Sequence, residues 1–313
     1  MPYRHVPAMP NEVVRFLNCR PGKIYVDCTL GGSGHAGRIC EKILPDGILI
    51  GIDQDSDAIK NARKVLTPSG AIVHIVHDNF IHLPTILSEL GIRAADGILL
   101  DLGLSLHQIE ASGRGFSFTR DEPLDMRMNI ESEQRAEDII NRESERSLIK
   151  IFKEYGEERR ARPIARKIIS ERKKDRIRTT LQLVRIITAA LPKEVRRKQK
   201  IHPATRTFMA LRIAVNRELE RLESFLEFAA DHLNPGGRLC VLSFHSLEDR
   251  IVKQRFKALE KGCTCPPDFP QCICNKKSVA RILTRKVVRP TPEEVTSNPM
   301  ARSTKLRALE KIL

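Results

Sequence analysis

The sequence predicts an α/β fold, in which a Rossmann-like parallel sheet carries an inserted helical domain. Short apolar strands alternate with helix-sized segments as far as residue 101, and this alternation is typical of parallel sheets with right-handed crossovers. More than 130 residues then separate Asp101 from the next clear strand at Leu239. Because a crossover helix needs far fewer residues, the surplus indicates an insertion.

The first segment combines two strands, a glycine-rich turn and a helix. In order these are Ile24–Asp27, Gly31–Gly34, Gly34–Ile43 and Ile48–Asp53. Glycines let the backbone approach a ligand closely, and an acid about 20 residues further on accepts hydrogen bonds from ribose hydroxyls. Asp53 lies 19 residues after Gly34. The sequence therefore predicts a site for a nucleoside cofactor.

Two cofactors compete for this turn. Gly32, Gly34 and Gly37 fit the G-x-G-x-x-G pattern of dinucleotide sites. S-adenosyl-L-methionine fits better, because it has no pyrophosphate and needs polar groups for its amino-acid tail. Asp27 at the end of the first strand supplies such a group. With this cofactor, the fold class becomes a class I (Rossmann-like) methyltransferase sheet with an inserted helical domain.

The other expected elements of the sheet follow in order. A short helix lies within His5–Leu17, and later come a helix at Asp57–Leu66 and strands at Val73–His77, Gly97–Asp101, Leu239–Phe244 and Ile282–Val288. The turn Asn234–Arg238 leads into the strand at Leu239. Ligands of open α/β sheets bind at the carboxyl ends of the strands. Asp101 is therefore expected beside the cofactor.

The long segment after Asp101 is helix-forming and basic. Candidate helices are Glu133–Asn141, Ser144–Tyr155, Arg160–Lys173 and Thr180–Leu191. Apolar residues at three- and four-residue spacing from Phe208 to Phe225 then predict one long helix that packs on the sheet. We expect residues 106–203 to form an inserted basic helical domain for RNA recognition. Residues 1–105 and 204–313 would form a discontinuous methyltransferase domain that binds S-adenosylmethionine.

The charge of the chain indicates an anionic partner. Residues 135–217 contain 24 Lys and Arg but only 10 Asp and Glu, which is nearly all of the net charge of +15. Such a segment usually faces nucleic acid, although a solvated helical surface is the alternative. No apolar run approaches the length of a membrane span, and the N-terminus lacks the apolar stretch of a signal peptide. We therefore expect a cytoplasmic protein that does not contact membranes.

The eight cysteines fall into two groups. Cys19, Cys28, Cys40 and Cys240 are scattered in apolar contexts, as expected of small core residues in a reduced protein. The other four lie within 12 residues, at positions Cys263, Cys265, Cys272 and Cys274. Four thiolates are sufficient for a structural zinc site. A loop of unligated thiols, or adventitious disulfides, is the alternative.

A series of longer motifs then identifies a family. In order they are His5–Pro7, Tyr25–Asp27, Gly34-His35, Asp101–Gly103, Arg114–Phe118, Pro123–Met128, Tyr155–Arg159, His202–Phe208 and Ser243–Arg250. Together they resemble the bacterial ribosomal RNA small subunit methyltransferase H family, over almost the whole chain. The resemblance implies methylation of N4 of a cytidine in the decoding region of 16S rRNA, within the small ribosomal subunit, with S-adenosylmethionine as the donor.

The resemblance also implies the cofactor contacts. They are Ser33, Gly34 and His35 in the turn, Asp53 at the ribose, Phe80 beside the adenine, and Asp101 and Gln108 at the far rim. The family more often has glycine at position 33, so a serine is expected to fit if its φ is negative. The family also has proline where this chain has His107, which affects the rigidity of that loop.

The amino nitrogen of cytosine is a weak nucleophile, because its lone pair is delocalised into the ring. An enzyme that methylates it must therefore position this nitrogen and accept a proton from it. Asp101 and Ser105 are the candidate catalytic residues, since an oxygen at the end of that strand accepts the amino hydrogen. Candidate aromatic partners for the base are Phe116, Phe118, Phe208 and Phe244. Methylation at carbon 5 needs a cysteine nucleophile. No cysteine lies directly after the strand that ends at Asp101, so this chemistry is disfavoured.

Two other functions stay open on the sequence. One is a nicotinamide-dependent oxidoreductase that uses the same glycine turn, and it leaves the basic insertion unexplained. The other is an RNA-binding assembly factor with a vestigial cofactor fold. The sequence does not decide between a monomer and a dimer.

Overall fold

A computed structural model describes residues 6–312 apart from 199–200, 263–264, 266–270, 272 and 275–276. The chain divides into two compact units, one formed by Leu106–Glu218 and the other by Pro2–Ser105 with Leu219–Leu313. We call the first the insert unit and the second the sheet unit. Among the described residues, no helix combines the length and the apolar character that crossing a membrane requires.

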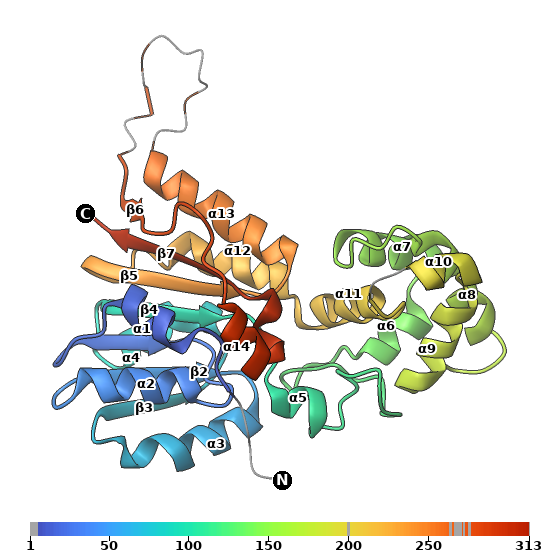
Figure 1. Ribbon diagram of the computed structural model, residues 1–313, viewed down its shortest axis with the longest axis horizontal. Coiled ribbons are helices and arrows are strands. Elements are labelled where there is room, and N and C mark those ends of the chain that lie inside the picture. Colours follow the sequence, from blue (N-terminus) through green and yellow to red (C-terminus); the bar gives the residue numbers. More distant parts are fainter. Residues whose placement is uncertain are drawn as a thin grey trace. The chain divides into compact units, whose positions relative to one another are not determined.

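The sheet unit contains one seven-stranded sheet in the order β3-β2-β1-β4-β5-β7-β6 (Figure 1). The strands are β1 (Ile24–Asp27), β2 (Ile48–Asp53), β3 (Ile72–His77), β4 (Ala95–Asp101), β5 (Leu233–Ser243), β6 (Ala280–Ile282) and β7 (Lys305–Lys311). Strands β1 to β5 pair in parallel, and β7 pairs antiparallel with both β5 and β6. The chain order reverses between β1 and β4, where α/β sheets bind ligands. The predicted fold class is therefore confirmed.

Helices cover both faces of this sheet because its strands are apolar on both sides. Helices α1 (Pro10–Leu17), α2 (Gly34–Ile43) and α3 (Ser56–Leu66) pack on the face to which Tyr25 and Leu49 point. Helices α4 (Leu83–Glu89), α12 (Glu218–Phe228) and α13 (Ser246–Lys261) pack on the opposite face, with Val26 and Ile50. Successive residues along β1, and likewise along β2, therefore point to opposite faces of the sheet and belong to different hydrophobic cores.

The insert unit is helical, as the sequence predicts. Its helices are α5 (Leu106–Glu110), α6 (Ala136–Arg142), α7 (Glu145–Glu154), α8 (Ala161–Arg172), α9 (Thr180–Ala189), α10 (Lys193–Lys198) and α11 (Thr205–Asn216). Four of them match the expected helices. The short helices α5 and α10 were not expected, since neither has enough residues for a recognisable apolar period.

The single long helix expected from Phe208 to Phe225 was wrong. Arg217 has a left-handed φ of 50° and ends α11, so that α12 is a separate helix. Phe208 and Leu211 are buried on α11 in the insert unit, whereas Leu222 and Phe225 lie in the core beneath the sheet. The insert unit therefore extends to Glu218, beyond the expected boundary at residue 203.

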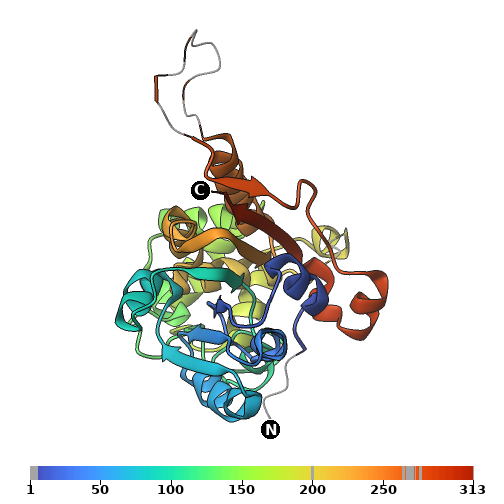
Figure 2. The same ribbon diagram turned by 90° about the vertical axis from the view of Figure 1, so that its left-hand side faces the viewer.

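The C-terminal strands also differ from expectation. Strand β6 covers only Ala280–Ile282, and Val288 makes an isolated bridge with Leu306. The unexpected strand β7 lies between β5 and β6, and Figure 2 shows β6 and β7 side by side. Strand β5 begins at Leu233, because Leu233 pairs with Ala95 before a register shift near Gly97. The residues expected to form a turn thus belong to the strand.

Candidate active site

Three carboxylates mark the carboxyl ends of three neighbouring strands. Asp27 ends β1, Asp53 ends β2 and Asp101 ends β4. Asp27 is 1% exposed. Among the described residues, Oδ2 of Asp27 and Oδ1 of Asp101 are buried without a hydrogen-bond partner. Buried polar atoms are rarely left unpaired, so this cluster is suited to a bound proton or a cationic ligand.

The acids hold their protons more tightly than acids in water do. Burial raises the pKa of Asp53 to about 6 and that of Asp101 to about 7. Burial also raises the pKa of Asp27 well above its ordinary value, and the charges of Asp101 and Asp53 raise it further. A cation placed among the three carboxyls would favour their ionised forms. The cluster is thus electrostatically complementary to a positively charged ligand.

Asp53 is held in a fixed orientation by the glycine turn. Its Oδ2 accepts a hydrogen bond of 2.8 Å from the Gly31 N–H, and its Oδ1 accepts one of 2.8 Å from the Asp55 N–H. Each carboxylate oxygen can accept a second hydrogen bond. Asp53 therefore retains the acceptor capacity that two ribose hydroxyls need.

The condition under which a serine was expected to fit at position 33, a negative φ, is not met. Ser33 precedes α2 with φ of 62° in the left-handed region, where a side chain is strained and glycine is not. Its hydroxyl is buried and has no hydrogen-bond partner among the described residues. Glycine suits the next position for a different reason, because a Cβ on Gly34 would lie 2.7 Å from Cδ of Pro7.

His35 and Asp101 lie next to each other beside this turn. Nε2 of His35 is 3.6 Å from Oδ2 of Asp101, and both side chains are largely buried. The Asp101 N–H donates a 2.7 Å hydrogen bond to Oγ1 of Thr29, and the Gly103 backbone bonds the carboxyl group. Asp101 is thus fixed by its own backbone neighbours. The structure brings His35 and Asp101 together, although sequence alone gave no reason to pair them.

Ser105 lies near the same turn, whereas Gln108 belongs to the other compact unit. Ser105 is buried, and its Cβ is 3.9 Å from the position that a Cβ on Gly31 would take. Gln108 is buried on α5 within the insert unit. Its contact with the cofactor therefore stays a prediction.

Phe80 and two polar residues follow the neighbouring strand ends. Phe80 is buried and meets Phe225 edge to face, with 5.3 Å between the ring centroids. Nδ2 of Asn79 and Nη1 of Arg221 both donate 2.8 Å hydrogen bonds to Oε1 of Gln54. Sequence reasoning missed this polar chain. The available signal was that Gln54 and Asn79 each follow a strand that ends at the ligand-binding edge.

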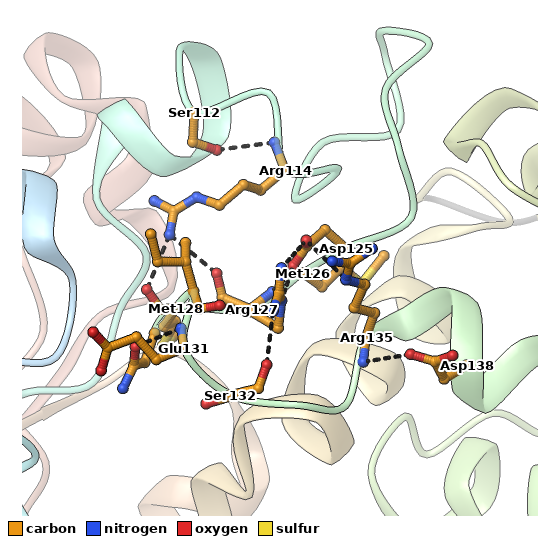
Figure 3. A network of polar contacts seen from close by, with 12 residues as sticks. Ser112, Arg114, Asp125, Met126, Arg127, Met128, Glu131, Ser132, Arg135 and Asp138 are labelled. Carbon is orange, nitrogen blue, oxygen red and sulfur yellow. Dashed lines mark hydrogen bonds and ion pairs between the residues drawn. The ribbon is translucent and has the colours of Figure 1, made fainter.

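Several motif residues in the insert unit are structural (Figure 3). Nη1 of Arg114 donates hydrogen bonds to the carbonyls of Arg127 and Met128, at 3.0 and 2.9 Å. Nε and Nη2 of Arg127 each donate a 2.7 Å hydrogen bond to the carboxylate of Asp125. These bonds hold a loop in which Met126 has a left-handed φ of 60°. The Arg and Asp side chains of these motifs thus stabilise the loop.

The four candidate aromatic residues differ in burial. Phe116 and Phe208 are buried, while Phe118 and Phe244 are half-buried. A Cβ on Gly103 would lie 2.8 Å from the Phe244 ring, so that Phe244 covers the end of β4. Phe118 therefore remains the most accessible candidate in the insert unit.

The zinc expectation receives no support. Cys263 and Cys272 lie outside the described residues. No cysteine in the described ranges belongs to a group of three or more side chains that could share a metal ion. Cys28, Cys40 and Cys240 are buried as expected, and Cys19 is half-buried.

Comparison with known proteins gives consistent results. A family model described as the MraW methylase family matches residues 2–312. Proteins named ribosomal RNA small subunit methyltransferase H from Desulforapulum autotrophicum and Desulfosudis oleivorans are each 56% identical over 312 residues, which cover all of both chains. The protein of that name from Pelobacter propionicus is 50% identical over 311 residues, or 99% of each chain.

Proposed function

This chain belongs to the MraW methylase family, and on that basis we propose that it methylates N4 of a cytidine in the decoding region of 16S rRNA. The donor is S-adenosylmethionine and the substrate is the small ribosomal subunit. One observation carries the proposal, namely the three carboxyls at the carboxyl ends of the neighbouring strands β1, β2 and β4. They suit a ligand that combines a ribose with a net positive charge, whereas nicotinamide dinucleotides carry a negatively charged pyrophosphate.

The residues present fit this donor. The oxygens of Asp27 and Asp101 that have no hydrogen-bond partner among the described residues would stabilise the positive charge of the donor, and Asp53 would accept hydrogen bonds from its ribose hydroxyls. Ser33, Gly34 and His35 in the turn, together with Phe80 and Gln108, would supply the remaining contacts to the donor. Bound at this site, the cofactor supplies a methyl group that is activated by the positive sulfur.

Asp101 and Ser105 act on the cytosine amino group. The carboxylate of Asp101 accepts an amino hydrogen, which directs the nitrogen lone pair toward the methyl group and takes up the proton as the bond forms. Burial raises the pKa of Asp101 to about 7 without donor, and a positively charged donor would lower it, so that Asp101 would be ionised and able to accept a proton at neutral pH. Ser105 helps to position the base, and such positioning alone accounts for a large part of a rate enhancement.

The insert unit binds the RNA. Several arginines of this unit are exposed and have no ion pair among the described residues, among them Arg146, Arg159, Arg160, Arg162, Arg178, Arg185 and Arg197. Other basic residues are engaged within the unit, as Arg176 is with Glu137. Exposed arginines are available to phosphates, and the affinity for RNA should fall steeply with salt. A cytoplasmic location is consistent with this substrate and stays a prediction.

The test is methyl transfer from labelled S-adenosylmethionine to small subunits isolated from cells that lack this modification. The wild type should label the RNA. Asp53→Ala should reduce donor affinity in calorimetry by at least about 100-fold, because two ribose hydrogen bonds to a charged acceptor are lost. Asp57→Ala, which removes a half-buried acid from the first turn of α3, is the matched control and should bind normally.

Two results would contradict this function. Binding of a nicotinamide dinucleotide in place of S-adenosylmethionine would indicate an oxidoreductase. Tight binding to small subunits without any transfer of label would indicate an assembly factor.

A further inference from the structure

The insert unit carries an exposed aromatic pair, formed by Phe118 and His202. Their rings stack with 4.7 Å between centroids and an interplanar angle of 16°. Phe118 is half-buried, and its ring meets the buried Phe208 edge to face at 5.4 Å. His202 is exposed. One face of the imidazole is therefore covered by Phe118, and the ring remains accessible from outside.

The His202 ring is held in place before any ligand binds. Nδ1 of His202 accepts a 3.2 Å hydrogen bond from the Ala204 N–H, which leaves Nε2 as the N–H of the neutral ring. Phe118 restrains the same ring through stacking, and Phe208 on α11 restrains Phe118. A ring that is already fixed loses little conformational entropy on binding.

The surroundings of this pair are basic and contain a further exposed apolar side chain. Ile201 is 45% exposed. The first turn of α11 has no acidic residue and contains Arg206, whose Nη1 donates to the Glu157 carbonyl. His202 itself belongs to the segment 135–217, which contains nearly all the excess positive charge. An exposed aromatic ring among cations is the arrangement with which proteins bind single-stranded nucleic acid.

We propose that His202, backed by Phe118, is a stacking platform for one unpaired nucleobase of the RNA outside the target cytidine. This inference rests on the proposed function, since it assigns a binding site for the same substrate. The flat ring accepts a base of any identity, and the neighbouring cations bind the strand that carries it. The platform thus adds affinity for single-stranded RNA without reading its sequence.

The probe is a fluorescein-labelled RNA of 15 nucleotides that spans the decoding-region cytidine, with binding measured by fluorescence anisotropy. His202→Ala and His202→Leu should weaken binding about 5- to 100-fold, the range that alanine substitution of a stacking aromatic produces. His202→Phe keeps a flat ring and should stay within about twofold of the wild type. His232→Leu is the matched control, because His232 also packs against a phenylalanine, Phe228, but in the sheet unit.

Two further measurements separate stacking from other roles. In an abasic scan, each probe lacks the base at one position. Loss of the base that stacks on His202 should lower the affinity of the wild type. The same loss should leave the affinity of His202→Leu unchanged, because this variant has already lost that contact. The slope of log Kd against log salt should be equal for both proteins, since stacking releases no counterions. Equal weakening by His202→Phe and His202→Leu, or a changed slope, would indicate a phosphate contact and overturn the platform.

Methyl transfer to small subunits distinguishes the two proposals. A wild type that transfers the methyl group, together with His202→Leu that binds the probe equally well, refutes the platform alone. A wild type that binds the probe through His202 but transfers no methyl group refutes the proposed function alone. Thermal melting of each variant, and its affinity for S-adenosylmethionine, show that the sheet unit is intact.

Discussion

The turn that contains Ser33 shows how one side chain can conflict with its backbone. Ser33 has φ of 62° and a buried hydroxyl without a partner among the described residues. A left-handed conformation is unfavourable for any residue with a Cβ by roughly 1–2 kcal/mol. The sequence could not reveal this conflict, because the motif identifies a glycine turn but does not give the sign of φ at each position.

We expect Ser33→Gly to stabilise the protein by about 1 kcal/mol, since glycine adopts this φ without steric strain and the unpaired hydroxyl is removed. The measurement is urea unfolding of the protein without cofactor. Ser88→Gly provides the control, because Ser88 is exposed on the right-handed helix α4 and the same change should destabilise there. A loss of stability in Ser33→Gly would mean that the serine hydroxyl has a stabilising role.

The pH dependence of donor binding follows from Asp53 and Asp101, whose pKa values are raised to about 6 and about 7. A positively charged donor binds best when both are ionised, so its affinity should fall about tenfold between pH 8 and pH 6 through Asp101 alone. Calorimetry in buffers of different ionisation enthalpy should detect proton release on binding near pH 6.5. Asp101→Asn should weaken binding at pH 8 and remove the step near pH 7.

The same raised pKa values lower the free energy of unfolding as the pH rises, whereas they increase the affinity for the donor. A carboxyl whose pKa is raised by folding contributes stability below its unfolded pKa, near 4, and loses that contribution as the pH rises through its folded pKa. The protein without donor should therefore lose stability between pH 5 and pH 8, and bound donor should reduce that loss. An affinity that stays constant from pH 6 to pH 8 would contradict the proposed role of Asp101.

Helices and strands whose apolar residues recur with a regular period were predictable. The break between α11 and α12 and the charged strand β7 were not. Helix α2 was expected with the bounds that it has, because its apolar residues recur with the helical period. The spacing of apolar residues continues through Arg217, so the left-handed residue that separates α11 from α12 left no signal. Strand β7 was missed because its alternating charges look like exposed chain, whereas Arg307 is paired with Asp249.

The end of α11 is held by Asn216, which links it to the loop that carries Met126. Its Oδ1 accepts a hydrogen bond of 2.8 Å from the Met128 N–H, and its Nδ2 donates to the Met126 carbonyl at 2.8 Å. Asn216→Ala should destabilise the protein by about 2–3 kcal/mol in urea unfolding, because buried backbone groups lose their partners. Gln134→Ala, an exposed change in the same unit, should stay within about 0.5 kcal/mol. Equal effects would argue against a structural role for Asn216.

At the scale of the whole molecule, the proposed cofactor site was more predictable than the proposed RNA-binding surface. Strand ends are visible in the sequence, and the fold brings the ends of parallel strands to one edge, so that Asp53 and Asp101 could be placed by chemistry alone. Gln108 lies in the insert unit, and its role depends on an arrangement of units that a motif does not encode. The Phe118–His202 stack joins residues more than 80 positions apart, and no local pattern connects them.

The most direct test identifies the nucleoside that the enzyme makes. Small subunits from cells that lack the modification are incubated with the protein and S-adenosylmethionine, and their RNA is digested and analysed by mass spectrometry. The proposed function, in which Asp101 and Ser105 act at the end of β4, predicts N4-methylcytidine at one decoding-region position. Formation of 5-methylcytidine, of a methylated nucleoside other than cytidine, or of no methylated product would contradict this account.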